Sequence, residues 1–219
     1  MKVLVAGATG QTGRQVVEQL VARGESVRAL VRDIEKAKSS LPTNLEIVTG
    51  DVLEPETLQA ALLGCNAVIC ATGASPSFDI TGPYKVDYEG NKNLIEAAKA
   101  AAIGHFVLVS SLCTSKFFHP LNLFWLILYW KKQAEEHLQK SGLTYTIVRP
   151  GGLRNETNSE PLVMAPADTL FEGNIPRQKV AQVCVEALFQ PEAKNKVVEV
   201  ITRENAKPQP LETLFANVG

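Results

Sequence analysis

Three glycines, Gly7, Gly10 and Gly13, follow the first apolar run of the chain and lead without a gap into a helical pattern. Residues 2–6 are typical of a β-strand, and residues 11–23 have the spacing of an amphipathic helix. A helix that begins directly after a strand points its unpaired N–H groups beyond the end of that strand. Glycines at such a turn remove the side chains that would keep a phosphate away from those donors. The stretch therefore predicts a dinucleotide-binding strand–turn–helix unit.

Each glycine of this turn has an expected task. Gly7 suits the tight turn, Gly10 the close approach of a pyrophosphate, and Gly13 the packing of the helix on the strand. A bare strand-to-helix turn also uses glycine, so the flanking strand and helix carry the prediction. The expected cofactor-binding residues of the turn are Gly7, Thr9, Gly10, Gln11, Thr12 and Gly13.

The rest of the chain alternates between strand-like and helical runs, which predicts an α/β fold. We expect one NAD(P)-binding domain over residues 1–219, with a Rossmann-type, doubly wound, mostly parallel sheet, helices on both faces and a small C-terminal substrate lobe. Residues 153–175 carry scattered Pro, Asn and Asp and are expected to be irregular and to lie on the substrate side. The expected strands are 2–6, 26–31, 45–48, 66–71, 105–109, 143–148 and 196–201, and the expected helices are 11–23, 55–63, 83–102, 131–140, 175–189 and 211–216.

Composition excludes some partners. The net charge of −1, with both signs interspersed, gives no global field that would recruit nucleic acid or an anionic membrane. The four cysteines lack C-x-x-C spacing and lie mostly in apolar runs, which favours reduced, buried thiols in a cytoplasmic or plastid-stroma-like compartment. The three histidines are far apart and form no metal-ligand motif, so no metal is expected.

In an open parallel sheet, ligands bind beyond the carboxyl ends of the strands. After the second strand, Arg32 comes before Asp33. A guanidinium can pair with a 2′-phosphate, so this order favours NADP over NAD, although a solvated Arg–Asp pair on a loop is the alternative. The remaining expected contacts follow the third and fourth strands: Asp51 and Val52 at the adenine, and Ala71, Thr72 and Gly73 at its ribose.

Several motifs together resemble a known family over nearly the whole chain. They are Gly-Ala-Thr-Gly-Gln-Thr-Gly at 7–13, Leu-Val-Arg-Asp at 30–33, Gly-Asp-Val at 50–52, Ser-Ser at 110–111 and Tyr-Thr-Ile-Val-Arg-Pro-Gly-Gly at 145–152. The chain is similar to the atypical short-chain dehydrogenase/reductases. Within them it resembles the NADPH-dependent flavin reductase, or biliverdin-IXβ reductase, branch. The run at 167–173 looks most like related chloroplast and cyanobacterial NAD(P)H-binding proteins.

The family's Tyr-x-x-x-Lys pair is where this chain departs. Alignment back from Thr146 places the lysine at Lys131 and the tyrosine at Ile127, which cannot donate a proton. Tyr129, two residues on, would point elsewhere on a helix. The flavin reductase branch also lacks the tyrosine. The resemblance therefore implies NADPH-dependent hydride transfer to FMN or another flavin, to biliverdin, or to a similar flat conjugated acceptor, with the cofactor supplying the difficult chemistry.

The same resemblance assigns residues to the nicotinamide end. Ser111 matches a serine that lines the active site in that branch, and Lys131 is expected at the nicotinamide ribose; both are the catalytic candidates. A serine that merely ends a strand and a lysine on a helix surface are the alternatives. Ser110, Pro150, Gly151 and Gly152 are expected to bring backbone close to the nicotinamide.

Residues 117–130 form an unusual aromatic and apolar segment. Phe117, Phe118, Trp125 and Trp130 could line a wall for a planar acceptor. Three alternatives remain: a buried helix start, which the sequence favours, a partner surface, or contact with a membrane interface. The apolar run is too short to span a bilayer, which needs about 20 apolar residues.

Two other functions compete with flavin reduction. One is an NADPH-sensing binding or assembly protein of photosynthetic membranes with little turnover, suggested by the chloroplast-type resemblance and the aromatic run. The other is a quinone or enone reductase, which would need a lysine acid such as Lys131 or Lys132 near the ring.

Overall fold

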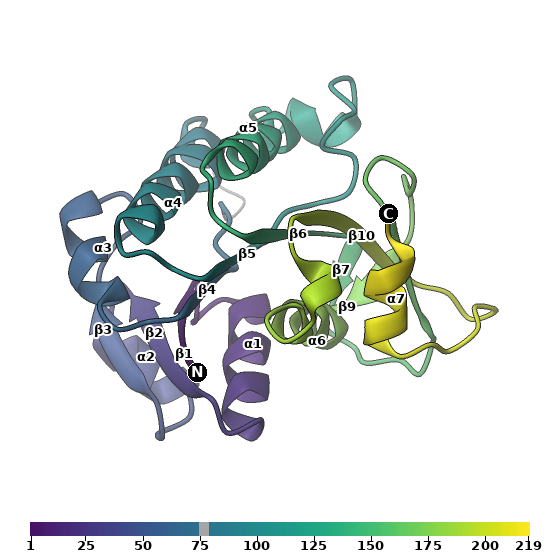
Figure 1. The fold of residues 1–219 in the computed structure, drawn as a ribbon. Helices are drawn as coiled ribbons and strands as arrows, with labels where there is room; N and C mark the ends of the chain where they lie inside the picture. Colours follow the sequence, from purple (N-terminus) through teal and green to yellow (C-terminus); the bar gives the residue numbers. More distant parts are fainter. Residues whose placement is uncertain (75–78) are drawn as a thin grey trace.

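The computed structural model describes residues 1–74 and 79–219, and its central sheet carries seven parallel strands in the order β3-β2-β1-β4-β5-β6-β10 (Figure 1). Their order reverses between β1 and β4, the place where such sheets bind ligands. The predicted Rossmann-type, mostly parallel sheet is confirmed. These strands are β1 (Lys2–Ala6), β2 (Ser26–Val31), β3 (Glu46–Thr49), β4 (Ala67–Cys70), β5 (His105–Val109), β6 (Tyr145–Pro150) and β10 (Lys196–Thr202).

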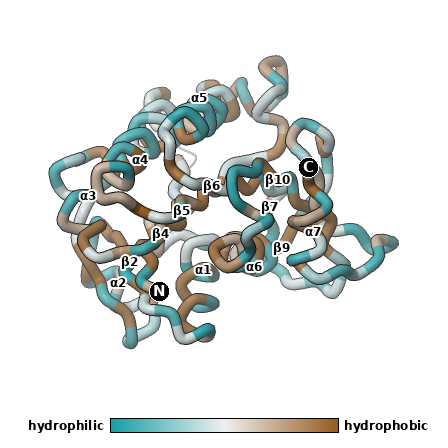
Figure 2. Tube along the Cα trace, viewed as in Figure 1, coloured by the Kyte–Doolittle hydropathy of each residue, from teal (hydrophilic) through white to brown (hydrophobic). Residues whose placement is uncertain are grey.

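Helices cover both faces of the sheet (Figure 1). One face packs against α1 (Gln11–Ala22), α2 (Ile34–Ser40) and α6 (Arg177–Ala187), and the other against α3 (Pro55–Leu62), α4 (Asn91–Ala100) and α5 (Ile127–Lys140). The inner strands are apolar along nearly their whole length because both of their faces are buried. Figure 2 shows the hydrophobic residues concentrated in these strands and on the helix faces turned toward them.

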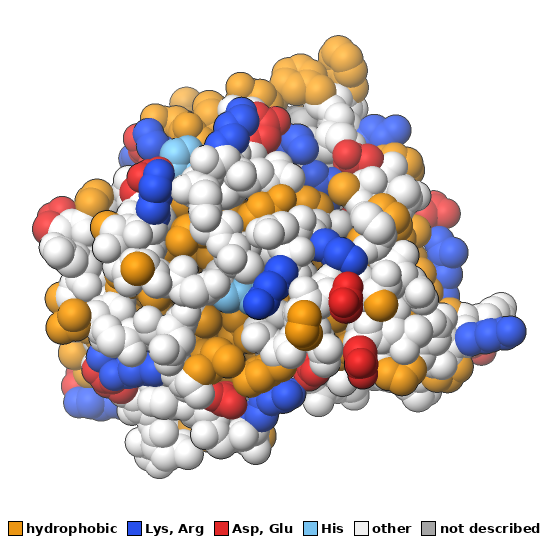
Figure 3. Space-filling model, in the orientation of Figure 1, with side chains coloured by type: hydrophobic (Ala, Val, Ile, Leu, Met, Phe, Trp, Pro, Cys, Tyr) orange, Lys and Arg blue, Asp and Glu red, His pale blue; other side chains and the backbone are white. Residues whose placement is uncertain are grey.

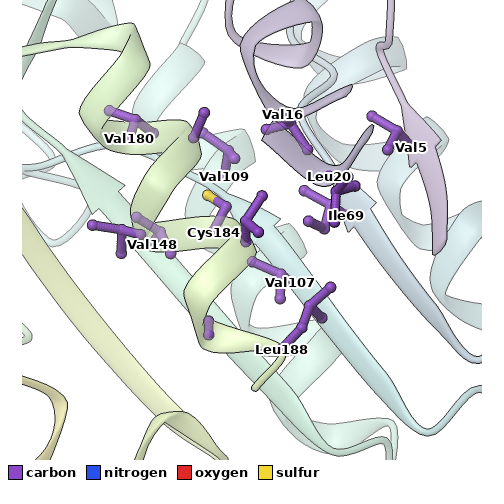
Figure 4. Close-up of a cluster of buried hydrophobic side chains, with 14 of the residues drawn as sticks. Val5, Val16, Leu20, Ile69, Val107, Val109, Val148, Val180, Cys184 and Leu188 are labelled. Carbon is purple, nitrogen blue, oxygen red and sulfur yellow. The ribbon is translucent and has the colours of Figure 1, made fainter. Parts of the chain in front are cut away.

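The α1–α6 side shows how the helical pattern is used. Val16 and Leu20 lie four residues apart on α1 and are fully buried, and Cys184 of α6 lies beside them over Val107 and Val148 of the sheet (Figure 4). The cluster joins apolar side chains of both helices to apolar side chains of the sheet. It fixes α1 against β1, and thus the position of the glycine turn between them.

Two predicted helices differ in detail from the structure. The helix expected over 83–102 is a π-helix, η1 (Pro83–Gly90), that continues into α4. The helix expected from residue 131 begins at Ile127, after a short 3₁₀ turn, η2 (Pro120–Leu123). The loop expected after β4 includes Ser75 and Pro76, which lie outside the described residues.

The expectation that residues 153–175 are irregular was wrong. The region contains β7 (Gly152–Arg154), β8 (Leu162–Pro166) and β9 (Asn174–Pro176). β8 and β9 pair antiparallel with β10, and β7 pairs with β9. The three strands are short and partly exposed, and β8 and β9 end in proline, so tertiary pairing within the sheet rather than local propensity forms them. η3 (Pro191–Ala193) and α7 (Leu211–Asn217) complete the C-terminal side.

Candidate functional site

A cleft of about 530 Å³ opens where the strand order reverses. Its wall consists of the turn after β1, residues 30–32 and 50–53 at the ends of β2 and β3, and residues 71–74 after β4, with Lys36 at one end. The fold thus brings together many of the predicted cofactor residues: Gly7, Thr9, Gly10, Arg32, Asp51, Val52, Ala71, Thr72 and Gly73.

The glycine turn has the geometry that its sequence predicts. Gly7 has a positive φ of 78°, and a Cβ there would lie 2.7 Å from the carbonyl oxygen of Ala71. A Cβ on Gly13 would lie 2.0 Å from the carbonyl oxygen of Gly7, so only glycine lets α1 pack this closely. Gly10 caps α1 without any side-chain hydrogen bond, which leaves the first N–H groups of the helix available to a ligand. Gln11, Thr12 and Gly13 form the first turn of α1, outside the cleft wall.

Charges at the β2 end of the cleft are arranged for an anion. The Asp33 carboxylate accepts a hydrogen bond from the backbone N–H of Lys36 at 3.0 Å and thereby caps α2. Arg32 is exposed, lines the cleft and lies 3.9 Å from Asp51. The cleft therefore presents the side chains of Arg32 and Lys36 here, while the carboxylate after Arg32 serves the helix.

Lys131 lies beside Gly73, which is part of the cleft wall. Its ammonium donates to Asp87 Oδ1 at 2.7 Å, and the ideal Cβ position of Gly73 lies 3.8 Å from Lys131 Nζ. Asp87 is completely buried, and its second oxygen accepts from the N–H of Ala74 at 3.2 Å. Lys131 is thus held at the end of β4 and is not a solvated surface lysine.

Ile127 lies one turn before Lys131, at the start of α5. It is half-buried and packs against a small apolar cluster that includes Leu112, Leu128 and Ile201. The ring of Tyr129 packs instead against Trp130, with ring centroids 4.9 Å apart, and against Phe117 at 6.1 Å. The position that would carry a tyrosine acid is therefore part of a hydrophobic contact.

The two serines after β5 have different surroundings. Ser110 is buried and donates to Glu135 Oε1 at 2.5 Å. Ser111 is half-buried and follows directly. The hydroxyl of Ser110 thus has a partner inside the protein, and the expected contact of Ser111 with a ligand stays a prediction.

A buried cluster of charges lies behind the serines. Arg149, only 1 % exposed, donates from Nε and Nη2 to Glu135 at 2.9 and 2.7 Å and from Nη1 to Glu199 at 3.3 Å and Asp168 at 2.8 Å. Glu199 also accepts from the N–H groups of residues 168–170, at 2.6–3.0 Å. This set joins α5, β6, β10 and the loop at 168–170.

The carboxyl group of Asp168 titrates under competing influences. Burial raises its pKa, but a hydrogen bond from Ser115 and the nearby Arg149 guanidinium outweigh that effect. The pKa of Asp168 is consequently lower than usual, and the group is ionised at neutral pH.

Gly151 and Gly152 have a packing role that the sequence does not reveal. A Cβ on Gly151 would lie 2.5 Å from the carbonyl oxygen of Gly173, and one on Gly152 would lie 2.5 Å from Asn174 Oδ1. The protein itself fills the space that a side chain would take, so these glycines let the turn after β6 pack on the segment before β9. The expected approach of Pro150, Gly151 and Gly152 to the nicotinamide stays a prediction.

The aromatic segment is not the buried helix start that the sequence favours. Phe118 is 96 % exposed, and Phe117 and Trp125 are exposed as well. The physical reason is Asn122, which faces inward, accepts from the N–H groups of Leu128 and Tyr129 and donates to the carbonyl of Phe117. Because the polar residue turns in, its apolar neighbours turn out.

Trp130 differs from the other three aromatic candidates. Its ring packs on Tyr84 and Tyr88 of η1, with centroids 4.8 and 5.8 Å apart. It therefore joins α5 to η1. A role of the four aromatic residues in binding an acceptor stays a prediction.

Within the described parts of the chain, no helix is both long enough and apolar enough to cross a membrane, and no three His, Cys, Asp or Glu side chains gather as a metal site would require. All four cysteines are buried and free.

The family model described as NAD(P)H-binding matches residues 7–191, which include the whole cleft. The chain belongs to the NAD(P)H-binding family. The cleft fits that assignment on its own geometry, with an uncapped helix start at the glycine turn, cations at the β2 end and the Lys131–Asp87 pair beside Gly73.

Several relatives are reductases or chloroplast proteins. An uncharacterized chloroplastic protein of Arabidopsis thaliana is 49 % identical over 99 % of this chain and 82 % of its own length. The chloroplastic protein TIC 62 of Pisum sativum is 40 % identical over 99 % of this chain, which spans only 46 % of that protein. The sanguinarine reductase of Eschscholzia californica is 35 % identical, with 91 % and 88 % of the two chains covered.

Two solved structures of this NAD(P)H-binding type superpose closely. A putative NAD-dependent epimerase/dehydratase from Bacillus halodurans has a TM-score of 0.87 at 28 % identity, with both chains fully covered. An anaerobilin reductase from Escherichia coli O157:H7 has a TM-score of 0.80 at 25 % identity, covering 95 % of this chain and all of the other. The predicted resemblance to atypical, NAD(P)H-binding dehydrogenase/reductases is confirmed, and the solved structures add an epimerase/dehydratase to the similar proteins.

The most informative site residues missed by sequence reasoning are Asp87, Asn91 and the carboxylates around Arg149. Asp87 and Asn91 are one turn apart and share a face with the buried Leu94, a signal that could have marked them as inward-facing. Asn91 Oδ1 accepts from Thr72 at 3.2 Å and from the thiol of Cys70, which fixes the end of β4. Glu199, in the otherwise apolar run of β10, was a similar signal.

Proposed function

We propose that this protein is an NADPH-dependent reductase that transfers hydride to flat conjugated acceptors, such as FMN, other flavins or biliverdin, without a tyrosine general acid. The observation that carries the proposal is the Lys131–Asp87 pair at the cleft with Ile127 one turn earlier. The sanguinarine and anaerobilin reductases among the relatives support a reductase over a carbonyl dehydrogenase.

Bound NADPH supplies the hydride, and the chain binds and orients it. In this proposal, the ammonium of Lys131 donates to the nicotinamide ribose and is held in place by Asp87. Ser111 binds the carboxamide of the nicotinamide or the acceptor. Arg32, assisted by Lys36, holds the 2′-phosphate. Because Ile127 has no proton to give, the proton that accompanies the hydride comes from water, so each turnover consumes one NADPH and one proton per reduced acceptor.

Steady-state NADPH oxidation with FMN, riboflavin and biliverdin tests the proposal. Lys131→Met and Asp87→Asn should each lower kcat/KM by about 10- to 100-fold, the range expected for a charged hydrogen bond. Lys140→Met, on the exposed part of the same helix, is the matched control and should change nothing. Tight NADPH binding without turnover of any of these acceptors would overturn the proposal.

A second candidate is an NADPH-sensing assembly protein of photosynthetic membranes with little turnover. The exposed apolar segment at 117–126 and the likeness to TIC 62 favour it. The same assay separates the two, since this candidate requires NADPH binding without acceptor reduction. An enone or quinone reductase, the third candidate, would be revealed by turnover of a quinone but not of FMN.

The buried free thiols and the chloroplastic relatives support a reducing location, either a cytoplasm or a plastid stroma. Fractionation of cells that express the tagged chain tests this. Recovery of disulfide-bonded protein from an oxidising compartment would contradict it.

A further inference from the structure

Residues 117–126, which we call the apolar tip, project beside the start of α5. The large side chains of Leu123 and Phe124 are 82 % and 65 % exposed, and five others in the tip are exposed too. Figure 3 shows hydrophobic side chains gathered on a projection at the upper right. Single exposed apolar residues are common on protein surfaces and need no explanation. A contiguous exposed apolar patch marks a contact surface.

The tip is held with its apolar side outward. Asn122 is buried and bonds to the backbone on both sides of it, to the carbonyl of Phe117 and to the N–H groups of Leu128 and Tyr129. Trp125 and Leu126 both have positive φ, 58° and 59°, a left-handed conformation that non-glycine residues rarely adopt. Strain of this kind persists only where the surrounding structure enforces it and is common at functional segments.

Charge identifies the kind of partner. From residue 97 to residue 134 the sequence contains no Asp or Glu, but it contains Lys99, Lys116, Lys131 and Lys132. The net charge of −1 for the whole chain therefore conceals a long stretch with cations only. Lys116 lies directly before the tip and is exposed, and Lys132 follows it on α5. Large apolar side chains with Trp among them and Lys at the border are the composition that settles at a lipid–water interface.

We infer that the apolar tip inserts into the surface of an anionic lipid bilayer, with Lys116 at the headgroups. The tip is convex, which suits a deformable interface. The inference is independent of the reductase proposal, because lipid binding requires no turnover.

Vesicle co-sedimentation with the full chain tests the inference, using phosphatidylcholine vesicles and vesicles of phosphatidylcholine with phosphatidylglycerol. We expect binding to the second kind that weakens as salt increases. Leu123→Ser and Phe124→Ser should each weaken it about tenfold, because each removes an exposed apolar side chain that the bilayer would bury. Lys116→Gln should weaken it about fivefold on the anionic vesicles only.

Leu63→Ser is the matched control. Leu63 is 75 % exposed at the end of α3, so the same substitution removes a similar apolar area far from the tip along the chain and should leave vesicle binding unchanged. Unchanged NADPH binding and melting temperature in all variants would show that the fold is intact.

The two tryptophans give a direct readout. In Trp130→Phe, the exposed Trp125 is the single indole, and its emission should move to shorter wavelength and be shielded from acrylamide when vesicles are added. In Trp125→Phe, the packed Trp130 should change little. Absence of binding to anionic vesicles, binding that Leu123→Ser and Phe124→Ser leave unchanged, or burial of Trp125 in a concentration-dependent dimer instead would each overturn the inference.

Discussion

The cofactor cleft and the buried charge cluster behind Ser110 and Ser111 are held in shape by different forces. Around the cleft, backbone meets backbone: Gly7 lies against Ala71, and Gly13 against Gly7, at distances that leave no room for one more carbon atom. In the charge cluster, Arg149 pairs with the buried carboxylates of Glu135 and Glu199 and so joins α5, β6 and β10. The cleft should therefore be sensitive to added volume, and the charge cluster to lost charge.

The largest expected effect comes from breaking the charge cluster. Arg149→Met removes the guanidinium, and the fully buried carboxylates of Glu135 and Glu199 then lack their cationic partner. The loss of one partner from a buried ion pair costs about 3–5 kcal/mol of unfolding free energy. Chemical denaturation of the variant measures this. Arg203→Met, at an exposed arginine, is the control, and a loss below about 1 kcal/mol at Arg149 would show that the charges do not hold this region together.

Next in size is a test of the cleft. Gly7→Ala and Gly24→Ala carry the same left-handed strain, with φ of 78° and 82°, but nothing lies within 4 Å of a Cβ at Gly24. The difference between the two variants isolates steric overpacking, which we expect to cost about 1–3 kcal/mol. Thermal denaturation of both, with NADPH titrations, gives the comparison. Equal losses would mean that contact with Ala71 does not shape the turn.

A third test asks whether the loss of folding stability in acid comes from the charge cluster or from His105. Burial, and then the charge of Lys194, lowers the pKa of His105 to about 4 from its ordinary value of 6.5. A neutral His105 thus contributes stability that is complete above pH 6.5 and is lost as the pH falls toward 4. By pH 5 the loss amounts to about 2 kcal/mol.

Denaturation of the wild type and of His105→Gln at pH 8 and pH 5 measures this contribution. The variant should lose about 2 kcal/mol less than the wild type over that interval. The lowered pKa of Asp168 acts in the same direction at lower pH. The ionised carboxylate of Asp168 stabilises the folded protein, and this contribution is lost as the pH falls below the usual pKa of an aspartate. An identical pH dependence in wild type and variant would assign acid sensitivity to the carboxylates instead.

The smallest expected effect sharpens the cofactor assignment. Arg32→Ala should weaken NADPH binding about tenfold and leave NADH binding nearly unchanged, because an exposed guanidinium contributes modestly even to a phosphate. Lys38→Ala, an exposed lysine on α2, is the control. Equal weakening of both cofactors would show that Arg32 does not read the 2′-phosphate.

The same contrast explains what the sequence could predict. The glycine turn and the ranges of the main strands follow from local patterns, because each signal lies within a few residues of the structure it dictates. Asp87 and Lys131 are 44 positions apart, and Arg149 and Glu199 are 50 apart, so nothing local announces either pair. The tip was misjudged for another reason: apolar residues are usually buried, and only the inward turn of Asn122 reverses this.

The π-helical form of η1 has a consequence for how such sites change in evolution. Asp87, whose carboxylate meets the ammonium of Lys131, lies within this π-helix. Removal of one residue would restore an ordinary α-helix and rotate the residues before the deletion by about 100° relative to those after it. A single-codon deletion just after Asp87 would therefore turn the carboxylate away from the ammonium although every residue of the pair is retained. The number of residues in η1 therefore matters to the site as much as their identity. In an alignment of related sequences, a gap in this helix would mark a change in the site.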